Sequence, residues 1–425
     1  MAAMEKNNKN LNVPNLRFPE FSGEWKKYSL NDISTIYGRI GFRGYTVADI
    51  VEKGEGAIAL SPTNIDSNCL TYEKDNTYIS TYKYEESPEI KIFAGDIVFV
   101  KTGSTVGKVA FVDNIIDRTT LNPQLVVLKQ VKCNPYFLYL LMAAPCFQKH
   151  IKRITVGGAV PTLSQNEMGR IGITLPPNAE QDRISALFKL LNYRIETQKK
   201  IIEDLKKLKD AIAEKLFCSP DDEFPELRVV NSSDRWNLYQ LKDVCQRITE
   251  RNSLESSSLV LTIAAQYGLV SQTDFFNKSV ASENLSNYYL IRKGDFAYNK
   301  SYSGEYAWGA VKRLELYEKG VLSPLYICFR PNPLIVSADF LSHYFETHKW
   351  HNGIAQIAGE GARNHGLLNV SISDYFATLH RFPGLPEQKI IASYLDSLSD
   401  KISLANKELE CHSQQKRYLL ARMFI

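Results

Sequence analysis

The sequence has few cysteines, and none of them forms a pattern typical of a disulfide framework or a zinc site. The seven cysteines are scattered along 425 residues and include no C-x-x-C pair. This distribution favours a reducing cytoplasm over a secreted, disulfide-linked fold. The nearest approach to metal-ligand spacing is His348 and His351 in HKWH, which has no cysteine nearby. We therefore interpret the two histidines as part of a helix face, and we predict no metal site.

Long apolar runs and a strong charge of either sign are also missing. No apolar run reaches the roughly 18 residues of a membrane helix. The first residues, MAAMEKNNKNLNVPN, lack the apolar core of a signal peptide, so residues 1–20 are expected to be a mobile polar lead-in. With 51 basic and 47 acidic residues, composition alone does not indicate nucleic-acid binding. A DNA-binding chain of this kind would need clustered basic residues or charge supplied by another subunit.

The stretch VFVKTGSTVGKVAFV superficially resembles a phosphate-binding loop. A P-loop has four residues between its glycines and a hydroxyl residue after its lysine. Here only three residues separate Gly103 from Gly107, and Val109 follows Lys108. The sequence therefore predicts a loop between two strands and no ATP site.

Other catalytic motifs are equally incomplete. NPYF, residues 134–137, lacks one proline of the motif by which amino-methyltransferases hold a base, and no glycine-rich loop for S-adenosylmethionine precedes it. No Cys/His or Ser/His/Asp arrangement and no nuclease cluster can be singled out. We predict no catalytic residue, and we interpret NPYF as the start of a helix.

The chain contains an internal repeat. LPPNAEQDRISALF in the first half matches GLPEQKIIASYL in the second, which aligns Glu180 with Glu387 and continues without a gap to the end of the chain. Upstream, EWKKYSLNDI matches RWNLYQLKDV, and FAGDIVFVKTGS matches IRKGDFAYNKSYS. Each half is thus a mixed domain followed by about 40 residues of helical pattern.

The helical segments carry a narrow apolar stripe with alternating steps of three and four residues, which is typical of a coiled coil. The predicted packing positions are Ile184, Phe188, Leu191, Ile195, Ile202, Leu205 and Ile212 in the first segment, and Ile391, Leu395, Leu398, Ile402, Leu409 and Leu419 in the second. A helix of 40 residues is about 60 Å long. Its stripe must be covered by another helix, and the repeat supplies one. The alternative is that each helix packs on its own domain.

These patterns predict an α+β chain with two β-rich mixed domains joined by two long helices, which pack as an antiparallel coiled coil with pseudo-two-fold symmetry. The expected boundaries are 1–20 for the lead-in, 21–177 for the first domain, 178–217 for the first helix, 218–385 for the second domain and 386–425 for the second helix.

The paired PPNAEQ and GLPEQ segments and the signatures GDIVFVKTGSTVGKVAFV and GDFAYNKSYSGEYAWGAVKRLELYEKGVLSPLYICF carry a family resemblance. Over nearly its whole length, the sequence resembles a specificity subunit of a Type I restriction-modification system. The resemblance implies that each domain is a target recognition domain for one half of a bipartite double-stranded DNA site. It also implies a cytoplasmic complex with two methyltransferase subunits and with restriction-motor subunits. Adenine methylation and the use of S-adenosylmethionine, ATP and Mg would belong to those partners, and this chain would bind no cofactor.

Because the loops of the two domains differ, we expect an asymmetric target. Base edges are read by Arg, Lys, Asn, Gln, Ser and Thr. The DNA-binding candidates are Arg39, Arg43, Lys101, Thr102, Ser104, Lys108 and Thr162 in the first domain, and Asn299, Lys300, Ser301, Tyr302, Arg363, Asn364 and His365 in the second. Arg363, in a glycine-rich loop, is the strongest single candidate. For each residue, the alternative is an ordinary solvated loop position.

Two other classes of function stay open from the sequence. One is a non-catalytic coiled-coil adaptor that binds only protein partners, and the other is a fused nuclease or methyltransferase. Salt-dependent, sequence-selective DNA binding separates the first from a specificity subunit. Activity of the isolated chain with DNA and S-adenosylmethionine would reveal the second.

Overall fold

The computed structural model describes residues 12–72, 76–155, 160–231, 233–264, 268–276, 284–301, 306–358 and 367–425. The chain forms two compact units, the first unit being Met1–Gln198 with Glu408–Ile425 and the second unit being Lys199–Lys407. Two long helices, α6 (Asn178–Leu216) and α12 (Leu385–Arg422), each contribute to both units. Among the described helices, none combines the length and apolar character needed to cross a membrane.

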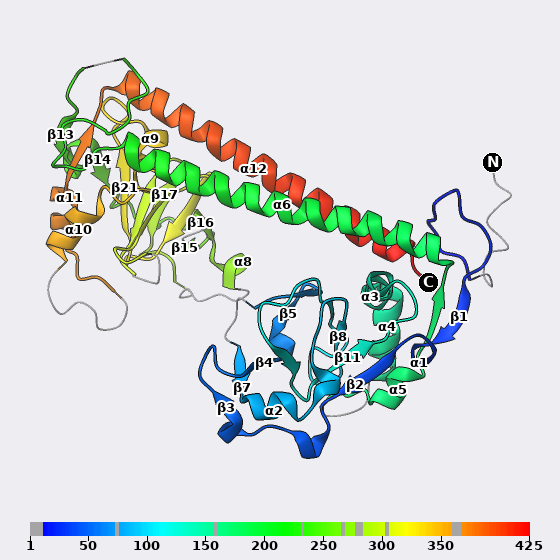
Figure 1. The fold of residues 1–425 in the computed structure, drawn as a ribbon. Helices are drawn as coiled ribbons and strands as arrows, with labels where there is room; N and C mark the ends of the chain where they lie inside the picture. The colour runs from blue at the N-terminus through cyan, green and yellow to red at the C-terminus, as the bar shows by residue number, and fades with distance from the viewer. Residues whose placement is uncertain are drawn as a thin grey trace. The chain divides into compact units, whose positions relative to one another are not determined.

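The first unit is built from short strands and short helices (Figure 1). Its strands are β1 Lys26–Ser29, β2 Thr35–Gly38, β3 Ile50–Val51, β4 Ala57–Leu60, β5 Ile65–Asp66, β6 Cys69–Leu70, β7 Thr77–Ile79, β8 Ile97–Val100, β9 Val109–Phe111, β10 Thr119–Leu121, β11 Leu125–Lys129 and β12 Gly172–Leu175. Its shorter helices are α1 Leu30–Ile33, α2 Thr81–Glu85, α3 Pro135–Ala143, α4 Pro145–Ile154 and α5 Gln165–Gly169, with 3-10 turns η1 Gly41–Arg43, η2 Val47–Asp49, η3 Pro62–Asn64 and η4 Pro88–Ile90. The strand orders are β2-β11-β8-β9-β6-β5, β10-β4-β7-β3 and β1-β12.

The second unit has the same kind of composition. Its strands are β13 Asn237–Gln240, β14 Cys245–Arg247, β15 Leu261–Ala264, β16 Gly268–Ser271, β17 Tyr289–Arg292, β18 Phe296–Asn299, β19 Ala310–Arg313, β20 Lys319–Leu322, β21 Ile327–Pro331 and β22 Leu379–Phe382. Its shorter helices are α7 Leu241–Val244, α8 Gln272–Phe276, α9 Ala338–Tyr344, α10 His351–Ile357 and α11 Ile372–Ala377. The strand orders are β14-β21-β18-β19, β13-β22, β15-β16 and β17-β20.

The central strands of the two units pair in the same register. In the first unit Val98 of β8 lies opposite Val127 of β11, and in the second unit Ala297 of β18 lies opposite Cys328 of β21. These four residues are all buried, so a shift of one residue would turn apolar side chains away from the core. The internal repeat of the sequence therefore corresponds to a repeated sheet.

A buried carboxylate supports each sheet at the same place. Asp96 accepts a hydrogen bond from the Phe93 amide and forms a 2.7 Å ion pair with Lys129. In the second unit Asp295 accepts from the Arg292 amide and forms a 2.6 Å ion pair with Arg330. A partly buried charge needs such partners. The aspartate of the repeated Gly-Asp pair therefore stabilises the turn before the central strand in each unit.

The repeated Glu-Gln pair fastens the start of each long helix to its domain. The Gln181 side chain accepts from the Asn134 amide at 2.9 Å and donates to the Pro176 carbonyl at 2.8 Å. Gln388 makes the same two bonds, to the Ser337 amide at 2.8 Å and the Pro383 carbonyl at 2.8 Å. Both glutamines are almost fully buried, and burial requires that their polar atoms be paired.

The glutamate of each pair binds an arginine that precedes the first strand of its unit, β1 or β13. Glu180 receives two hydrogen bonds of 2.7 Å from Arg17, and Glu387 receives bonds of 2.9 and 2.7 Å from Arg228. Bidentate pairs of this kind are strong and fix geometry. Of the expected lead-in over residues 1–20, residues 12–20 are described and contact the first unit through Arg17, and residues 1–11 lie outside the described part.

Within the first unit the two long helices run antiparallel. The Phe188 ring lies 6.0 Å from the ring of Phe424, just beyond the end of α12, and the Gln198 amide donates to Glu408 at 3.3 Å. Going forward along α6 from Phe188 to Gln198 therefore corresponds to going backward along the C-terminal segment from Phe424 to Glu408. Phe424 also packs 5.3 Å from Phe137 of α3, so the end of α12 completes the core of the first unit.

Within the second unit the end of α6 plays the corresponding part. The Phe217 ring packs 5.0 Å from Phe340 of α9, the equivalent of Phe137. Phe217 belongs to the same buried cluster as Ile391 and Leu395 of α12. Each long helix therefore ends in the core of the unit that contains the other copy of the repeat.

The predicted packing stripe lies on the covered side of both helices. Eight of its thirteen positions are buried, and the other five are half-buried: Leu205, Ile212, Ile402, Leu409 and Leu419. Gln198, which interrupts the apolar stripe, is also buried and bonds across the helix pair.

Candidate nucleic-acid interface

The loop between β8 and β9 is held by a second segment that is distant in sequence. Thr102 forms an antiparallel bridge with Thr162, the Gly103 amide donates to the Pro161 carbonyl at 2.9 Å, and the Leu163 amide donates to the Lys101 carbonyl at 2.8 Å. Ser104 and Thr162 are exposed beside this bridge. The structure thus brings together four of the predicted residues of the first domain, including Lys101 and Thr102.

The second unit repeats this bridge with different side chains. Ser301 pairs with Leu367, and the Leu368 amide donates to the Lys300 carbonyl at 2.9 Å. The Asn299 side chain accepts from the Ser301 amide at 3.0 Å, so its carbonyl group shapes the loop. Asn299, Lys300 and Ser301 are half-buried and lie at one end of the second sheet.

Gln124, which follows β10, is a neighbour of the first-unit loop that was not predicted from the sequence. Gln124 is exposed, and its carbonyl accepts from the Lys101 amide at 2.9 Å. Its side chain lies beside Gly103, whose added Cβ would be 3.5 Å from the Gln124 amide nitrogen. The equivalent residue of the second unit, Leu325, is 66% exposed and apolar. In the sequence, LNPQLVVL (121–128) aligns with LSPLYICF (322–329), and this alignment places Gln124 opposite Leu325.

The two lysines of the first loop have different surroundings. Lys101 is half-buried, and burial lowers its pKa from the ordinary value. The Lys108 ammonium donates to the Ile65 carbonyl at 3.0 Å, which ties the loop to β5. Lys108 is therefore held as a structural contact, whereas Lys101 has no ion pair among the described residues.

Arg39 does not have the exposure that contact with DNA requires. It is only 5% exposed, and its guanidinium donates to the Leu121 carbonyl at 2.8 Å and to the Thr120 hydroxyl at 3.2 Å. Burial also lowers its pKa from the ordinary value. We therefore withdraw Arg39 from the candidate set. Arg43 is half-buried and forms a 3.4 Å ion pair with Glu89, which leaves it a weaker candidate than the loop residues.

A basic helix beside the first loop was also missed. The Gln148 side chain of α4 donates to the Gly107 carbonyl at 2.8 Å, which fixes α4 to the loop. The exposed basic residues of α4 are Lys149, His150, Lys152 and Arg153. Basic residues on one helix face are a typical phosphate-binding feature. The basic pattern KHIKRI is visible in the sequence, but the proximity of this helix to the loop 101–108 is not.

Four predicted residues lie outside the described part of the chain: Tyr302, Arg363, Asn364 and His365. Their roles stay predictions.

The described residues contain no grouping of three or more His, Cys, Asp or Glu side chains that could hold a metal ion. Asn134 of NPYF caps α3, because its side chain accepts from the Phe137 amide at 3.0 Å. NPYF is therefore a helix start, as predicted from the repeat.

Comparison with known proteins points to one family. The model of the Type I restriction modification DNA specificity domain matches residues 22–207. The HindI specificity subunit of Haemophilus influenzae, a type I restriction enzyme subunit, is 23% identical over 257 residues, which are 59% of this chain and 53% of that protein. The putative type I enzyme MjaX specificity subunit of Methanocaldococcus jannaschii is 28% identical over 192 residues, 43% of each chain. These alignments span only 43–53% of the length of the relatives.

Solved structures share the fold over almost the whole chain. The type I restriction-modification S subunit from M. genitalium aligns with a TM-score of 0.53 and 15% identity, covering 97% of this chain and 99% of that one. A chain from a structure on complex assembly and conformational transition of the type I R-M system aligns with a TM-score of 0.55 and 15% identity, covering 93% and 96%. At this identity the likeness establishes the fold.

Proposed function

Because residues 22–207 match the type I specificity-domain model and the relatives found are type I specificity subunits, we propose that the chain is a subunit of this kind and recognises the DNA target of such a complex. In this role it contributes sequence recognition and no catalytic group. The target is double-stranded, bipartite and asymmetric, and each domain reads one half of it.

The observation that carries this proposal is a repeated frame with unlike reading loops. The same backbone bridge fixes Thr102 to Thr162 in the first unit and Ser301 to Leu367 in the second. The exposed residue beside it is polar Gln124 in one unit and apolar Leu325 in the other. Glutamine can hydrogen-bond an adenine edge, whereas an aliphatic side chain suits a thymine methyl group. Equivalent placement with unlike chemistry favours two different half-sites.

The remaining contacts follow from exposure and charge. Lys101, Ser104 and Thr162 surround the first loop, and Lys152 and Arg153 of α4 supply charge for phosphates. Lys300 and Ser301 take the corresponding places in the second unit. Phosphate contacts would set position and salt dependence, and the loops would set sequence preference.

Partner subunits complete the proposed complex. On α6 of the first unit, Leu190 is 65% and Tyr193 71% exposed, and on α12 of the second unit Tyr394 is 43% and Leu404 67% exposed. Exposed large apolar residues on a helix are typical of protein interfaces. We assign these faces to two methyltransferase subunits, with restriction-motor subunits joining them in the cytoplasm. S-adenosylmethionine, ATP and Mg would be bound by those partners, which methylate adenine and cleave DNA.

The proposal is tested by the DNA methylation pattern. The chain is produced with a type I methyltransferase subunit from the same genome in a host without other adenine methylation, and methylated positions are mapped by single-molecule sequencing. We expect one bipartite motif with two unlike halves and an unspecified spacer of fixed length. Identical halves would contradict asymmetric reading, and methylation without any motif would contradict the assigned function. A host producing the methyltransferase subunit alone is the control.

The alternative, a coiled-coil adaptor that binds only protein, is not favoured by the family match. It predicts that a complex with the methyltransferase subunit binds DNA without sequence preference.

A further inference from the structure

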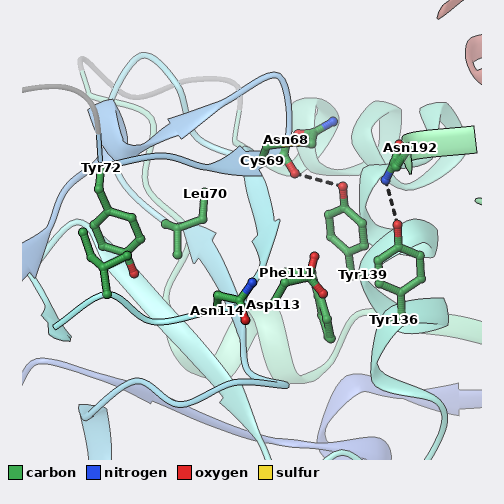
Figure 2. Close-up of a pocket in the computed structure, with 11 residues that line it drawn as sticks. Asn68, Cys69, Leu70, Tyr72, Phe111, Asp113, Asn114, Tyr136, Tyr139 and Asn192 are labelled. Atoms are coloured by element: carbon green, nitrogen blue, oxygen red, sulfur yellow. Dashed lines mark hydrogen bonds between the residues drawn. The ribbon is translucent and has the colours of Figure 1, made fainter. Parts of the chain in front are cut away.

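A cavity in the first unit lies apart from the candidate DNA-binding loop. Its volume is about 270 Å³, and Figure 2 shows the residues that surround it. The lining residues are Asn68, Cys69, Leu70, Tyr72, Phe111, Asp113, Asn114, Ile116, Tyr136, Tyr139 and Asn192. It lies beside Phe111, at the end of β9, whereas the loop 101–108 precedes the start of this strand.

Aromatic rings form one side of the cavity. Phe111 lies 5.1 Å from Tyr136, and Tyr136 lies 5.3 Å from Tyr139. The Tyr136 hydroxyl accepts from the Asn192 side chain at 2.7 Å, and the Tyr139 hydroxyl donates to the Asn68 carbonyl at 2.9 Å, as drawn in Figure 2. Burial raises the pKa of Tyr136 to about 12, so its ring stays neutral. Both rings are thus held in place by hydrogen bonds.

Asp113 brings a negative charge to this aromatic wall. It is exposed and lies two residues beyond Phe111. Among the described residues it forms no ion pair. The exposed Lys189 ammonium of α6 lies 5.0 Å from the centre of the Tyr136 ring, which is within the range of a cation–π contact.

The second unit fills the equivalent position with its own arginine. The shared sheet register places Arg313 where the first unit has Phe111, and Glu315 where it has Asp113. The equivalent starts of α3 and α9 place Asp339 at the position of Tyr136. Arg313 donates to Glu315 at 2.9 Å and to Asp339 at 2.5 Å. The carboxylate is therefore neutralised internally in the second unit and not in the first.

We propose that the first-unit cavity binds an arginine side chain of a partner protein, whose guanidinium pairs with Asp113 and packs against the aromatic wall that half-buried Phe111 forms with Tyr136 and Tyr139. Arginine suits such a site because its planar guanidinium can stack on aromatic rings and bind a carboxylate at once. A nucleobase is disfavoured, because the Asp113 carboxylate would repel the phosphates attached to it.

The surface beside the cavity indicates a protein as the source of the arginine. Tyr193 lies one turn beyond Lys189 on the same face of α6 and is 71% exposed. Neighbouring Leu190 is 65% exposed. A pocket for a charged anchor flanked by exposed apolar and aromatic residues is typical of protein–protein contact sites.

The inference is tested by titrating the full chain with N-acetyl-arginine methylamide and with the neutral isostere N-acetyl-citrulline methylamide, followed by NMR of labelled tyrosines. We expect the arginine derivative to bind at least about ten times more tightly than the citrulline derivative. Asp113→Asn should remove this difference, and Asp113→Lys should abolish binding of the arginine derivative. Glu315→Gln, at the position already neutralised by Arg313, is the matched control and should change neither affinity.

Equal binding of the two derivatives, or tyrosine signals unmoved by the arginine derivative at about 10 mM, would overturn the proposal. The same titration on the chain bound to a methyltransferase subunit distinguishes the source. Loss of binding there is expected if a partner arginine occupies the cavity, and undiminished binding would overturn the assignment to a protein arginine. Titration of the isolated chain requires neither DNA nor a partner, so its outcome is separate from that of the proposed function.

Discussion

The two units have equivalent buried contacts, which form a shared frame, but they differ in the exposed side chains that this frame carries. The ion pairs Arg17–Glu180 and Arg228–Glu387 occupy equivalent places, and so do the ring contacts Phe137–Phe424 and Phe340–Phe217. These buried contacts are therefore made by the same residue types at equivalent positions of the two units. This comparison indicates that the fold depends on a few buried pairs, and that the loops between them are free to differ.

The differences gather at the strand ends and on the exposed faces. Aligned on buried Ile151 of α4 and Ile354 of α10, the following residues are Lys152 and Arg153 in the first unit but Ala355 and Gln356 in the second. The first unit thus carries more positive charge next to its loop. Because charge attracts phosphates and not particular bases, we expect the first unit to contribute more to affinity.

The largest expected effect comes from shortening the aromatic side chains at the helix ends. Phe217→Ala and Phe424→Ala each remove a ring that is at most 3% exposed, and such cavities cost about 3–5 kcal/mol. Each helix ends in the core of the other unit, so Phe424→Ala should destabilise the first unit and Phe217→Ala the second. Hydrogen exchange measured by mass spectrometry resolves this. Exposed Tyr418→Ala on α12 is the control, and loosening of both units by either variant would contradict the comparison.

Breaking the Arg-Glu pairs should have the next largest effect. Glu180→Ala leaves the Arg17 side chain, 11% exposed, without its partner and should lower the free energy of unfolding by about 3 kcal/mol. Glu387→Ala should cost somewhat less, because its partner Arg228 is 15% exposed. Urea denaturation measures both. Glu203→Ala, in an exposed pair with Lys207, is the control and should leave stability unchanged. Equal stability of Glu180→Ala and wild type would show that the Arg17–Glu180 pair does not stabilise the first unit.

Acid should weaken the second unit before the first. His380 is buried between the Tyr344 and Thr378 hydroxyls, and burial lowers its pKa from 6.5 to about 3. Below pH 6.5 the unfolded chain protonates this histidine, whereas the folded chain does so only near pH 3. The contribution of the neutral histidine to the free energy of unfolding is therefore complete above pH 6.5 and is lost as the pH falls toward 3. At pH 4.5 the loss is about 2–3 kcal/mol.

The equivalent residue of the first unit is Ile173, which does not titrate. His380→Ile should therefore reduce the acid dependence of the second unit, to which His351 also contributes because burial lowers its pKa to about 4. Unfolding curves between pH 7 and 4.5 measure the reduction. An equally steep acid loss in wild type and variant would assign the effect to other groups.

The smallest expected effect concerns the basic face of α4. Replacing Lys152 and Arg153 together with alanine should weaken DNA binding of the assembled complex about tenfold, and it should reduce the slope of log affinity against log salt by about two. The DNA motif should be unchanged, because these residues contact phosphates. Filter binding at several salt concentrations measures this, with the exposed Lys26 and Lys27 of β1 as control positions. A changed motif with an unchanged salt slope would contradict the assignment.

The sequence predicts the parts of the fold that are periodic or repeated. Ile184 and Phe188 could be placed on a packing stripe because their spacing is local information, and the expected helix 178–217 compares with α6 Asn178–Leu216. The Glu-Gln pair could be recognised as important, but its partners could not. Arg17 is 163 positions from Glu180, and nothing in the sequence marks that contact.

The candidate site was harder to predict, because exposure is decided by tertiary contacts. Arg39 and Lys101 are both basic residues next to strands. One is buried against the Leu121 carbonyl, and the other lies in the bridged loop. Gln124 and α4 join the site only through backbone and side-chain contacts with the loop 101–108. Residue type and motif could identify the loop but not its neighbours.

We infer that the two units share a scaffold of buried contacts that carries exchangeable DNA-reading loops. The most direct measurement is the methylation motif of a chain in which residues 101–104 and Gln124 are replaced by their second-unit equivalents, residues 300–303 and Leu325. We expect that one half of the bipartite motif changes while the other half and the spacer length are retained. An unchanged motif, or the loss of both halves in a stably folded chain, would contradict it.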